Sequence, residues 1–438
     1  MELLPVLDGI HSAETFHPAF LDAFFERVAQ LESHPEEFED ALKGKVIATV
    51  FEEPSTRTRL SFEAAALRLG AGVITVADAG STSRAKGESL SDSAKVLGGY
   101  ADLLVWRHSK DGASRLAAQS AGVPVVNAGD GRLGHPTQTL VDLHTMRKEW
   151  GTFEGKVVGI LGDLRHGRTA RSLTWGLAAS GASILLLPGP GLAWEGGLEE
   201  RILSRFDYRR RPVSHALIPG WTGSSEAWLL EPRSFIQGQL FQGGPSEISS
   251  LDALYLTRLQ EERGARQERG SYPGVDPARM EDPLLSKCLL LHPLPRRGEL
   301  PESLDGDPRM RCFDQARFGP VVRQAIFLAL LREDAWPLPA VTPMPAGEVE
   351  HGLGPCPNPN CITLEEGIPS PWRVVGKRPR SFLCAFCDSA LPAEYVGCLS
   401  TRRVHPLHSA SAEKIRAENL KPFLAREQAE VAGFAWGG

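Results

Sequence analysis

Apolar residues along the chain alternate between helical spacing and short continuous runs. Between residues 13 and 43 they fall near one face of a helix, at Phe20, Leu21, Phe24, Phe25, Val28 and Leu31. Residues 45–51 form a continuous apolar run, which is typical of a buried strand. The polar segment 52–55 ends in Ser, a residue favoured at helix starts, so we expect a helix from there through residue 69.

Alternating strand and helix patterns continue along the chain in two successive regions, before and after Trp150. Further strands are expected at 73–76, 103–106 and 123–126, with helices at 88–100 and 111–121. After Trp150 the pattern restarts with a strand at 156–161, a loop at 162–167, a helix at 168–180 and a strand at 183–187. This repetition predicts two α/β units with parallel sheets. The lone Gly159-x-x-Gly162 spacing is a weak dinucleotide signal, and an ordinary strand–loop–helix is favoured there.

The second half of the chain is less regular. Residues 189–248 are rich in Gly, Pro, Arg and Trp without a clear period, so we expect a long, variable surface segment. Strands are predicted at 253–256 and 288–291, and an amphipathic helix at 318–332.

The predicted boundaries follow these changes of pattern. Two α/β domains span 1–150 and 151–300, and a helical segment at 301–335 returns to the first domain. A Pro-rich linker at 336–350 precedes a cysteine-rich domain at 351–402. The tail at 403–438 has Ala, Glu, Lys and Leu at helical spacing and is expected to be helical.

Composition narrows the possible functions. A length of 438 residues favours two or three domains, and a net charge of −6 argues against a nucleic-acid partner. No apolar run approaches the roughly 20 residues of a membrane-spanning helix, so no membrane partner is expected. The start Met1-Glu2-Leu3-Leu4-Pro5 lacks a signal-peptide pattern, and we expect a cytoplasmic protein.

Ser55-Thr56-Arg57-Thr58 is a candidate anion site. It lies between a predicted buried strand and a helix start, where free amide groups and the helix dipole attract anions. The hydroxyl groups add donors, and the Arg57 guanidinium matches phosphate geometry. The alternative is an ordinary helix cap with an arginine nearby.

Five of the seven cysteines crowd between Cys356 and Cys398, whereas Cys288 and Cys312 are isolated. Four have the spacing of paired zinc knuckles: Cys356, Cys361, Cys384 and Cys387. In a reducing compartment this predicts a structural zinc site with no open coordination position; unmetallated core cysteines are the alternative. Cys398 is expected to be a free buried thiol. A nucleic-acid-binding zinc ribbon is disfavoured, because no aromatic-basic face is evident.

Several motifs together resemble the carbamoyltransferase family over residues 1–190 and 250–335. They are Ser55-Thr56-Arg57-Thr58-Arg59, Lys86-Gly87-Glu88, Arg107-His108, His135-Pro136-Thr137-Gln138 and His292-Pro293-Leu294-Pro295. The resemblance implies two doubly wound parallel-sheet domains, the first binding carbamoyl phosphate and the second an amino acid. Tyr255-Leu256-Thr257-Arg258-Leu259-Gln260 resembles the aspartate motif of aspartate carbamoyltransferases. The ornithine enzymes carry a Cys where this chain has Pro293, so aspartate is favoured.

The resemblance also implies the roles of individual residues. The carbamoyl phosphate ligands would be Ser55, Thr56, Arg57, Thr58, Arg107, His135, Gln138, Leu294 and Pro295. Thr58, Arg107 and His135 would polarise the carbonyl group, and Arg57 and Lys86 complete the catalytic set. A neutral His135 that donates a hydrogen bond suits this role; a helix-capping imidazole is its alternative.

Aspartate would be held by Lys86, Arg168, Arg258 and Gln260, although a solvated surface Arg is the alternative for each arginine. Ser83 and Lys86 are expected to reach in from a neighbouring subunit, which makes a homotrimer the minimal active unit. Glu53 and Arg263 are a candidate pair linking the two domains when the site closes.

The cysteine-rich segment resembles the zinc domain of the aspartate carbamoyltransferase regulatory chain, including its Cys-Pro-Asn-x-Asn-Cys-Ile start. This implies a small zinc-binding β domain fused as a docking module, without the regulatory chain's nucleotide-binding domain. The chain is thus expected to transfer a carbamoyl group to L-aspartate in pyrimidine (UMP) synthesis, with no cofactor in catalysis. A carbamoyltransferase for another amino acid such as ornithine, or an inactive homologue acting as an assembly partner, are the alternatives.

Overall fold

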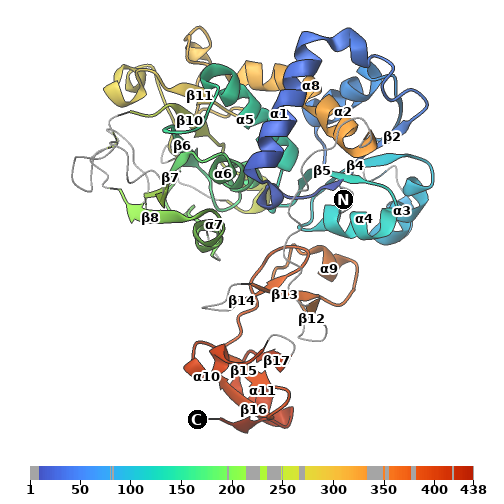
Figure 1. The fold of residues 1–438 in the computed structure, drawn as a ribbon, viewed down its shortest axis with the longest axis vertical. Coiled ribbons are helices and arrows are strands. Elements are labelled where there is room, and N and C mark those ends of the chain that lie inside the picture. The colour runs from blue at the N-terminus through green and yellow to red at the C-terminus, as the bar shows by residue number, and fades with distance from the viewer. Residues whose placement is uncertain are drawn as a thin grey trace. The chain divides into compact units, whose positions relative to one another are not determined.

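The computed structural model divides the chain into two compact units, Met1–Ser109 with Ala117–Thr342 and Lys110–Leu116 with Pro343–Gly438 (Figure 1). It describes residues 9–78, 80, 83–194, 197–213, 227–233, 248, 250–265, 272–332, 349–350, 355–375, 381–416 and 419–437. The expected linker at 336–350 lies almost wholly outside the described residues, as do residues 351–354 and much of 189–248. Each unit is therefore taken by itself.

The first sheet of the larger unit is parallel, with the order β1-β5-β4-β2-β3. Its strands are β1 (Gly9–Ile10), β2 (Val46–Phe51), β3 (Gly72–Val76), β4 (Leu103–His108) and β5 (Val125–Asp130). The four longer strands match the predicted apolar runs; β2, β4 and β5 are buried and therefore read as continuous apolar segments, whereas β3 is a largely exposed edge strand. The short strand β1 was not predicted, since two residues carry no detectable period.

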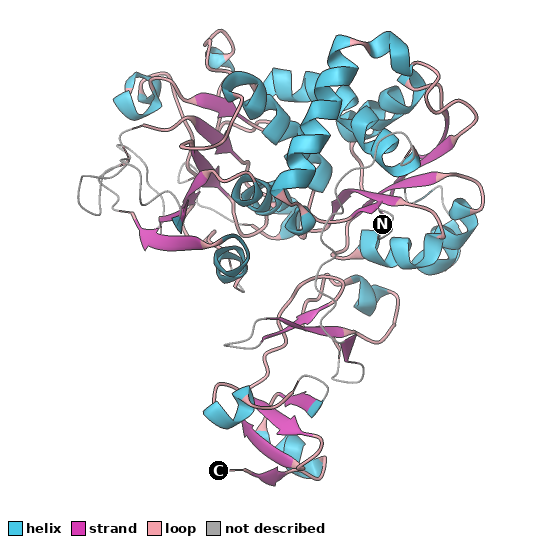
Figure 2. Ribbon diagram, viewed as in Figure 1, coloured by secondary structure: helices cyan, strands magenta, loops and turns pink. Residues whose placement is uncertain are grey.

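Helices surround this sheet (Figure 2). They are α1 (Pro18–Ser33), α2 (Thr56–Arg68), α3 (Leu90–Gly98), α4 (Ala113–Ala121) and α5 (Pro136–Trp150). The helix expected within 13–43 is shorter than its apolar pattern. It begins at Pro18, which lacks an amide hydrogen to satisfy, and ends before Pro35, which cannot continue it.

The second sheet has the order β11-β10-β6-β7-β9-β8 and is mixed. Four parallel strands form its core: β6 (Val157–Gly162), β7 (Ser183–Pro188), β10 (Ala253–Leu256) and β11 (Leu289–Leu291). Two antiparallel strands, β8 (Tyr208–Pro212) and β9 (Trp228–Pro232), extend it. They come from the segment predicted to be irregular, because the three arginines of β8 hide its strand character. The helices α6 (Arg168–Ala179) and α7 (Leu198–Phe206) accompany this sheet.

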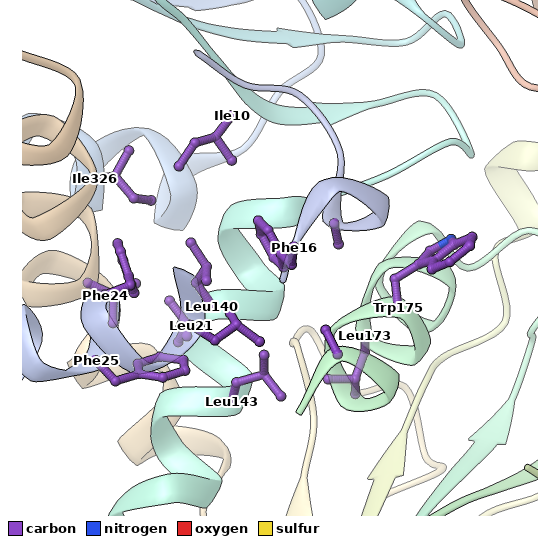
Figure 3. Close-up of a cluster of buried hydrophobic side chains, with 14 of the residues drawn as sticks. Ile10, Phe16, Leu21, Phe24, Phe25, Leu140, Leu143, Leu173, Trp175 and Ile326 are labelled. Atoms are coloured by element: carbon purple, nitrogen blue, oxygen red, sulfur yellow. The ribbon is translucent and has the colours of Figure 1, made fainter. Parts of the chain in front are cut away.

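One hydrophobic core runs through both sheets of the larger unit. Figure 3 shows part of it, where Phe24 of α1, Leu140 and Leu143 of α5 and Ile326 of α8 lie together. The helix α8 (Cys312–Leu331) is longer than the predicted 318–332 and packs against α1, α2 and α5. It therefore returns the chain to the first domain, as predicted for residues 301–335.

The C-terminal unit contains two small sheets. β12 (Val349–Glu350), β13 (Trp372–Val375) and β14 (Ser381–Cys384) form an antiparallel sheet, with the short helix α9 (Ile362–Glu365) nearby in sequence. The second sheet has the order β17-β15-β16-β18. Its elements are β15 (Tyr395–Cys398), β16 (Arg403–Pro406), α10 (Ala410–Glu413), β17 (Leu420–Phe423), α11 (Arg426–Val431) and β18 (Ala435–Trp436).

The predicted helical tail at 403–438 is therefore wrong, and so is a zinc-domain boundary at 402. β15 pairs with β16 and β17 across that boundary. Val404, Phe423 and Phe434 pack with Ala429 in a core of their own, and this tertiary packing overrides the helical propensity of the tail. Among the described residues of the whole chain, no helix is long and apolar enough to cross a membrane.

Candidate active site and metal centre

A cavity of about 540 Å³ in the larger unit collects the predicted substrate ligands. Its lining includes Ser55, Thr56, Arg57, Thr58, Arg107, His135, Gln138, Arg168, Arg258, Gln260, Leu294 and Pro295. These residues come from elements of both sheets, near the carboxyl ends of β2, β4, β6 and β10, where ligands bind in α/β folds. Only Ser83 and Lys86 of the predicted set are absent from the described lining.

The start of α2 is not an ordinary cap. Ser55 is the N-cap residue, yet its side chain makes no capping hydrogen bond. Its hydroxyl instead lies 3.0 Å from Thr58 Oγ1, to which it donates. The amide groups of the first helical turn therefore remain without a side-chain acceptor, which leaves them available to an anion.

Two arginines, Arg57 and Arg258, line this cavity near enough for their charges to interact. Arg57 has no anionic partner within the described part of the chain, and burial together with the nearby charge of Arg258 lowers its pKa. Arg258 forms a two-pronged ion pair with Glu262, which includes an Nη1–Oε2 distance of 2.9 Å. Closely placed cations of this kind favour an anionic ligand between them.

Glu53 connects three further arginines. Its Oε1 accepts from Arg107 Nη2 at 2.6 Å and from Arg168 Nη2 at 2.7 Å, and Arg263 Nη2 lies 3.4 Å away. Burial raises the pKa of Glu53, but the charges of Arg168 and Arg107 lower it to about 2 overall. The predicted Glu53–Arg263 pair is thus present, and it belongs to a larger cluster. The links of Glu53 to Arg107 and Arg168 were not predicted.

Gly129 permits the close approach of these cations. A Cβ atom at this position would lie 2.9 Å from both Arg107 Nη1 and Arg168 Cζ, and its φ of +114° disfavours any other residue. Arg107 Nη1 also donates to the carbonyl of Ala128 at 3.1 Å. The end of β5 therefore serves as a platform for the two guanidinium groups.

His135 is buried at the start of α5, and its side chain makes no capping hydrogen bond. Its backbone amide donates to Ser172 Oγ at 2.8 Å, which anchors the residue without using the ring. Burial, followed by the charges of Arg168 and Arg107, holds the pKa of His135 well below its ordinary value. This lowered pKa favours a neutral ring, which can act as a hydrogen-bond donor.

Gln138 is oriented by a buried carboxyl group that the sequence did not reveal. Its Nε2 donates to Asp142 Oδ1 at 2.8 Å, and Gln315 Nε2 of α8 donates to the same oxygen at 2.8 Å. Burial raises the pKa of Asp142 to about 7. Arg323 of α8 also lines the cavity and donates to Ser61 Oγ at 2.6 Å. The sequence offered one indication of this role, because Arg323 is a charged residue within the otherwise apolar pattern of α8.

Leu294 adopts a left-handed backbone conformation, with φ +56°. Such strain in a residue other than glycine persists only where its surroundings hold it, and it is frequent at functional sites. The Leu294 amide donates to His292 Nδ1 at 2.8 Å, and His292 Nε2 lies 2.8 Å from Glu299 Oε1. These contacts fix the backbone of Leu294, one of the residues expected to bind carbamoyl phosphate.

Gln260 and Arg258 are positioned by Asp163 and by local contacts. The Gln260 amide donates to Asp163 Oδ2 at 3.1 Å, and its side chain donates to the carbonyl of Arg258 at 3.2 Å. Burial raises the pKa of Glu262, but its hydrogen bond to Arg258 lowers it to about 2 overall. The Arg258 pair is therefore fully charged at neutral pH.

Ser83 and Lys86 lie on a short 3-10 turn, Ser83–Lys86, and both are exposed. The preceding residues Ser81 and Thr82 lie outside the described residues. The larger unit thus gathers most of the site in one chain and leaves these two side chains outside its cavity.

The C-terminal unit brings the four predicted cysteines together. The sulfur atoms of Cys356, Cys361, Cys384 and Cys387 all lie within 4.8 Å of one another. Two of their separations are 3.4 Å and 3.8 Å, close to the edge of a tetrahedron with Zn–S bonds of about 2.3 Å. Four buried thiols without a further donor in the set fit a structural zinc ion.

Residues 110–116 belong to the same unit and contact both cysteine knuckles. Arg115 Nη1 donates to the carbonyls of Ala385 and Phe386 at 3.1 and 3.0 Å, and to Asp388 Oδ1 at 2.8 Å. Asn358 Nδ2 donates to Asp111 Oδ2 at 2.8 Å. The zinc-binding loops are therefore supported by a second shell of polar contacts.

The family model described as aspartate/ornithine carbamoyltransferase, carbamoyl-P binding domain, matches residues 9–148. The aspartate carbamoyltransferase catalytic subunit of Methanopyrus kandleri is 40% identical over 317 residues, which are 69% of this chain and 92% of that protein. The chain belongs to the aspartate carbamoyltransferase family. The catalytic subunit of Methanothermobacter thermautotrophicus is 39% identical over 303 residues, 68% of this chain and 86% of its own.

Solved structures agree with this family membership. The aspartate transcarbamoylase of Trypanosoma cruzi, crystallised with aspartate and phosphate, has a TM-score of 0.59 and 29% identity, covering 75% of this chain and 98% of its own. A second family model, described as aspartate carbamoyltransferase regulatory chain, metal binding domain, matches residues 349–396. The predicted catalytic and zinc-binding parts are both confirmed, and the C-terminal unit carries a structural zinc site.

Proposed function

We propose that the chain transfers the carbamoyl group of carbamoyl phosphate to L-aspartate and releases phosphate. The observation that carries this proposal is one cavity that combines an uncapped helix start, an unpaired Arg57 and a neutral His135 within the described chain. We further propose that this reaction serves pyrimidine synthesis in the cytoplasm. The family membership and the cluster of free cysteines support these two statements.

In this proposal the phosphate group lies at the start of α2, against Ser55, Thr56, Arg57 and Thr58. Arg107, Thr58 and His135 donate hydrogen bonds to the carbonyl oxygen, where negative charge develops as the amine attacks. Such preorganised donors stabilise the oxyanion without rearrangement. Gln138 and the carbonyl of Leu294 orient the carbamoyl nitrogen, and Pro295 holds that peptide. The leaving phosphate accepts the proton released by the amine.

The two carboxylates of aspartate would be held by Arg168, Arg258 and Gln260, with Lys86 completing the site. Arg168 and Arg258 are paired with Glu53 and Glu262 in this structure. A substrate carboxylate would replace or share these partners, because it offers the same two-oxygen geometry. An ornithine side chain is cationic and would be repelled by this group of arginines.

A homotrimer with shared sites would supply the missing Lys86 and Ser83. Large apolar side chains are exposed on α2, on the edge strand β3, on α3 and just after α3, and an unfilled subunit interface would present such residues. They are Leu60 (51% exposed), Leu67 (64%), Ile74 (39%), Val96 (45%) and Tyr100 (66%). We also propose that the zinc-binding unit is a docking module for a higher assembly and lacks a nucleotide-sensing domain.

The substrate assignment is tested by assaying carbamoyl phosphate with aspartate, ornithine and other amino acids in parallel. The proposal predicts turnover with aspartate, and a large loss in Arg258→Met that appears mainly in the KM for aspartate. The same loss of positive charge at an exposed arginine, Arg317→Met, is the control. Carbamoylation of ornithine in preference to aspartate would contradict the assignment.

A further inference from the structure

Two consecutive carboxylates follow strand β2. Glu53 faces the cavity, whereas Glu52 faces the turn Ser83–Lys86. The hydrogen-bond partners of the two carboxylates differ, so Glu52 and Glu53 serve different surroundings. Arg84 Nε donates to Glu52 Oε2 at 2.7 Å, and the two side chains are only 12% and 5% exposed.

Glu52 is itself fixed by β4. Trp106 Nε1 donates to Glu52 Oε1 at 3.1 Å, and His108 Nε2 lies 3.6 Å from Glu52 Oε2. Burial raises the pKa of Glu52, but the hydrogen bond and charge of His108 and the charge of Arg84 lower it below its ordinary value overall. A buried, ionised carboxylate with three partners is held firmly in place. Removing one partner would leave part of its buried negative charge uncompensated, which costs free energy.

The turn has a defined shape around this anchor. The Gly87 amide donates to the Arg84 carbonyl at 2.9 Å, and the Glu88 amide to the Ser83 carbonyl at 3.3 Å. Glu88 accepts from Ser93 Oγ of α3 at 2.7 Å. Arg84 thus points inward to Glu52, while Ser83 and Lys86, on the same turn, are exposed.

We propose that Glu52 is a positioning residue: it holds Arg84 and thereby fixes the turn from which Ser83 and Lys86 reach the neighbouring subunit's cavity. This inference rests on the shared site of the proposed function. Glu52 and Glu53 are adjacent in the sequence. One short backbone segment therefore positions the arginines of its own subunit's cavity and also the turn that this subunit contributes to its neighbour's cavity. Glu52 does not contact substrate.

The first test compares Glu52→Gln and Arg84→Met with Lys95→Met, which removes an exposed cation on α3. Displacing a positioned group costs up to about 100-fold in rate, so we expect losses of that order in kcat/KM for aspartate in the first two variants. Arg84→Lys keeps the charge and should recover part of the loss. Lys95→Met should stay near wild type. Wild-type kinetics in both Glu52→Gln and Arg84→Met would overturn the proposal.

Hybrid trimers separate an effect on the turn from an effect on the chain's own cavity. Glu52→Gln damages the turn and leaves its own cavity intact, whereas His135→Ala does the reverse. A symmetric trimer pairs each cavity with the turn of a neighbouring subunit. When the two impaired variants are mixed equally, about half of the cavities are intact and about half of these receive an intact turn, so roughly a quarter of the sites should regain activity. Arg84→Met replaces Glu52→Gln in the same experiment if the latter does not assemble.

A matched mixture of Lys86→Ala and His135→Ala distinguishes failure of the Glu52 proposal from failure of the proposed shared site. If that mixture recovers activity and the Glu52→Gln mixture does not, Glu52 acts on its own cavity and the inference is overturned. If neither mixture recovers activity, the shared site itself is overturned, and the inference with it.

Discussion

Glu53 organises the site at the scale of single residues. One carboxylate holds Arg107, Arg168 and Arg263, which come from distant parts of the chain. Burial, followed by the charges of Arg168 and Arg107, lowers the pKa of His135, since a cation there would be desolvated and repelled. The cluster therefore sets the position of the donors and, together with burial, favours the neutral ring that the proposed reaction needs.

Removing the His135 ring should lower activity without destabilising the protein greatly. Loss of one oxyanion donor costs roughly 10²–10³ in kcat, and we expect His135→Ala to fall in that range. Because burial and then the charges of Arg168 and Arg107 hold the pKa of His135 well below its ordinary value, its titration should not appear in the pH profile of kcat/KM near the ordinary histidine value of about 6.5.

Steady-state kinetics from pH 6 to 9 would check both statements. His34→Ala changes an exposed histidine (59% exposed side chain) and is the matched control. A His135→Ala variant within threefold of wild type would show that the ring does not stabilise the developing charge.

The predicted residues share one property that explains why they could be found. Ser55 to Thr58, Arg107, His135 and Arg258 stand in short motifs next to strand ends. Asp142, Gln315 and Arg323 act from inside long helices, where the local sequence gives at most a charged residue within an apolar pattern, as at Arg323. Their roles depend on how α5 and α8 pack, which the local sequence does not specify.

At the scale of elements, α5 and α8 form a support behind the cavity. Asp142 of α5 receives Gln138 and Gln315, so one buried carboxyl group ties both helices to a proposed substrate ligand. The raised pKa of Asp142, about 7, means that the folded state keeps a proton that the unfolded chain releases at a lower pH.

This raised pKa gives stability a specific pH dependence. Between the ordinary value of 3.8 and about 7, the unfolded chain loses the Asp142 proton while the folded state retains it. The contribution to stability is therefore present below pH 3.8 and is lost as the pH rises towards 7. Asp142→Asn removes this dependence and should gain stability relative to wild type over that interval.

Each pKa unit corresponds to about 1.4 kcal/mol, so the relative gain should reach a few kcal/mol. Urea unfolding of both proteins at pH 5 and pH 8, at equal chain concentration, measures it. Asp305→Asn changes an exposed carboxylate in the same unit and should not reproduce the effect. Parallel pH dependences for Asp142→Asn and wild type would contradict a raised pKa.

Elements with a strong apolar period were predicted well, and the others were not. The buried strands β2, β4, β6, β7 and β10 follow continuous apolar runs that only a covered strand tolerates. The tail failed because its Ala and Glu content favours helices, whereas Val404, Phe423 and Phe434 bury their side chains between strands. The strands of the tail are stabilised by packing between segments that are distant in the sequence, and the sequence of one segment alone does not reveal this packing.

At the scale of the whole molecule, the chain joins a catalytic part to a zinc-binding unit. The four cysteines come from two loops whose spacing was readable in the sequence, and the structure closes them into one cluster. The support from residues 110–116 was not predictable, because it joins segments about 250 residues apart.

The zinc ion should be essential to the C-terminal unit. Binding of a structural zinc ion is itself folding free energy, so Cys384→Ala should abolish zinc binding and expose residues 355–437 to proteolysis. Metal analysis of the purified protein and limited trypsin digestion measure these two effects. Cys398→Ala removes a buried thiol outside the cluster and should retain one zinc ion per chain. Full zinc content in Cys384→Ala would exclude the four-cysteine site.

The central claim concerns the reaction itself, and product formation tests it most directly. The purified full chain is mixed with carbamoyl phosphate and L-aspartate, and phosphate and N-carbamoyl-L-aspartate are measured together over time. We predict equal amounts of the two products with the wild-type chain, and a loss of both in Arg57→Met. Phosphate release without carbamoyl-aspartate, or no turnover of aspartate at any concentration, would contradict the account.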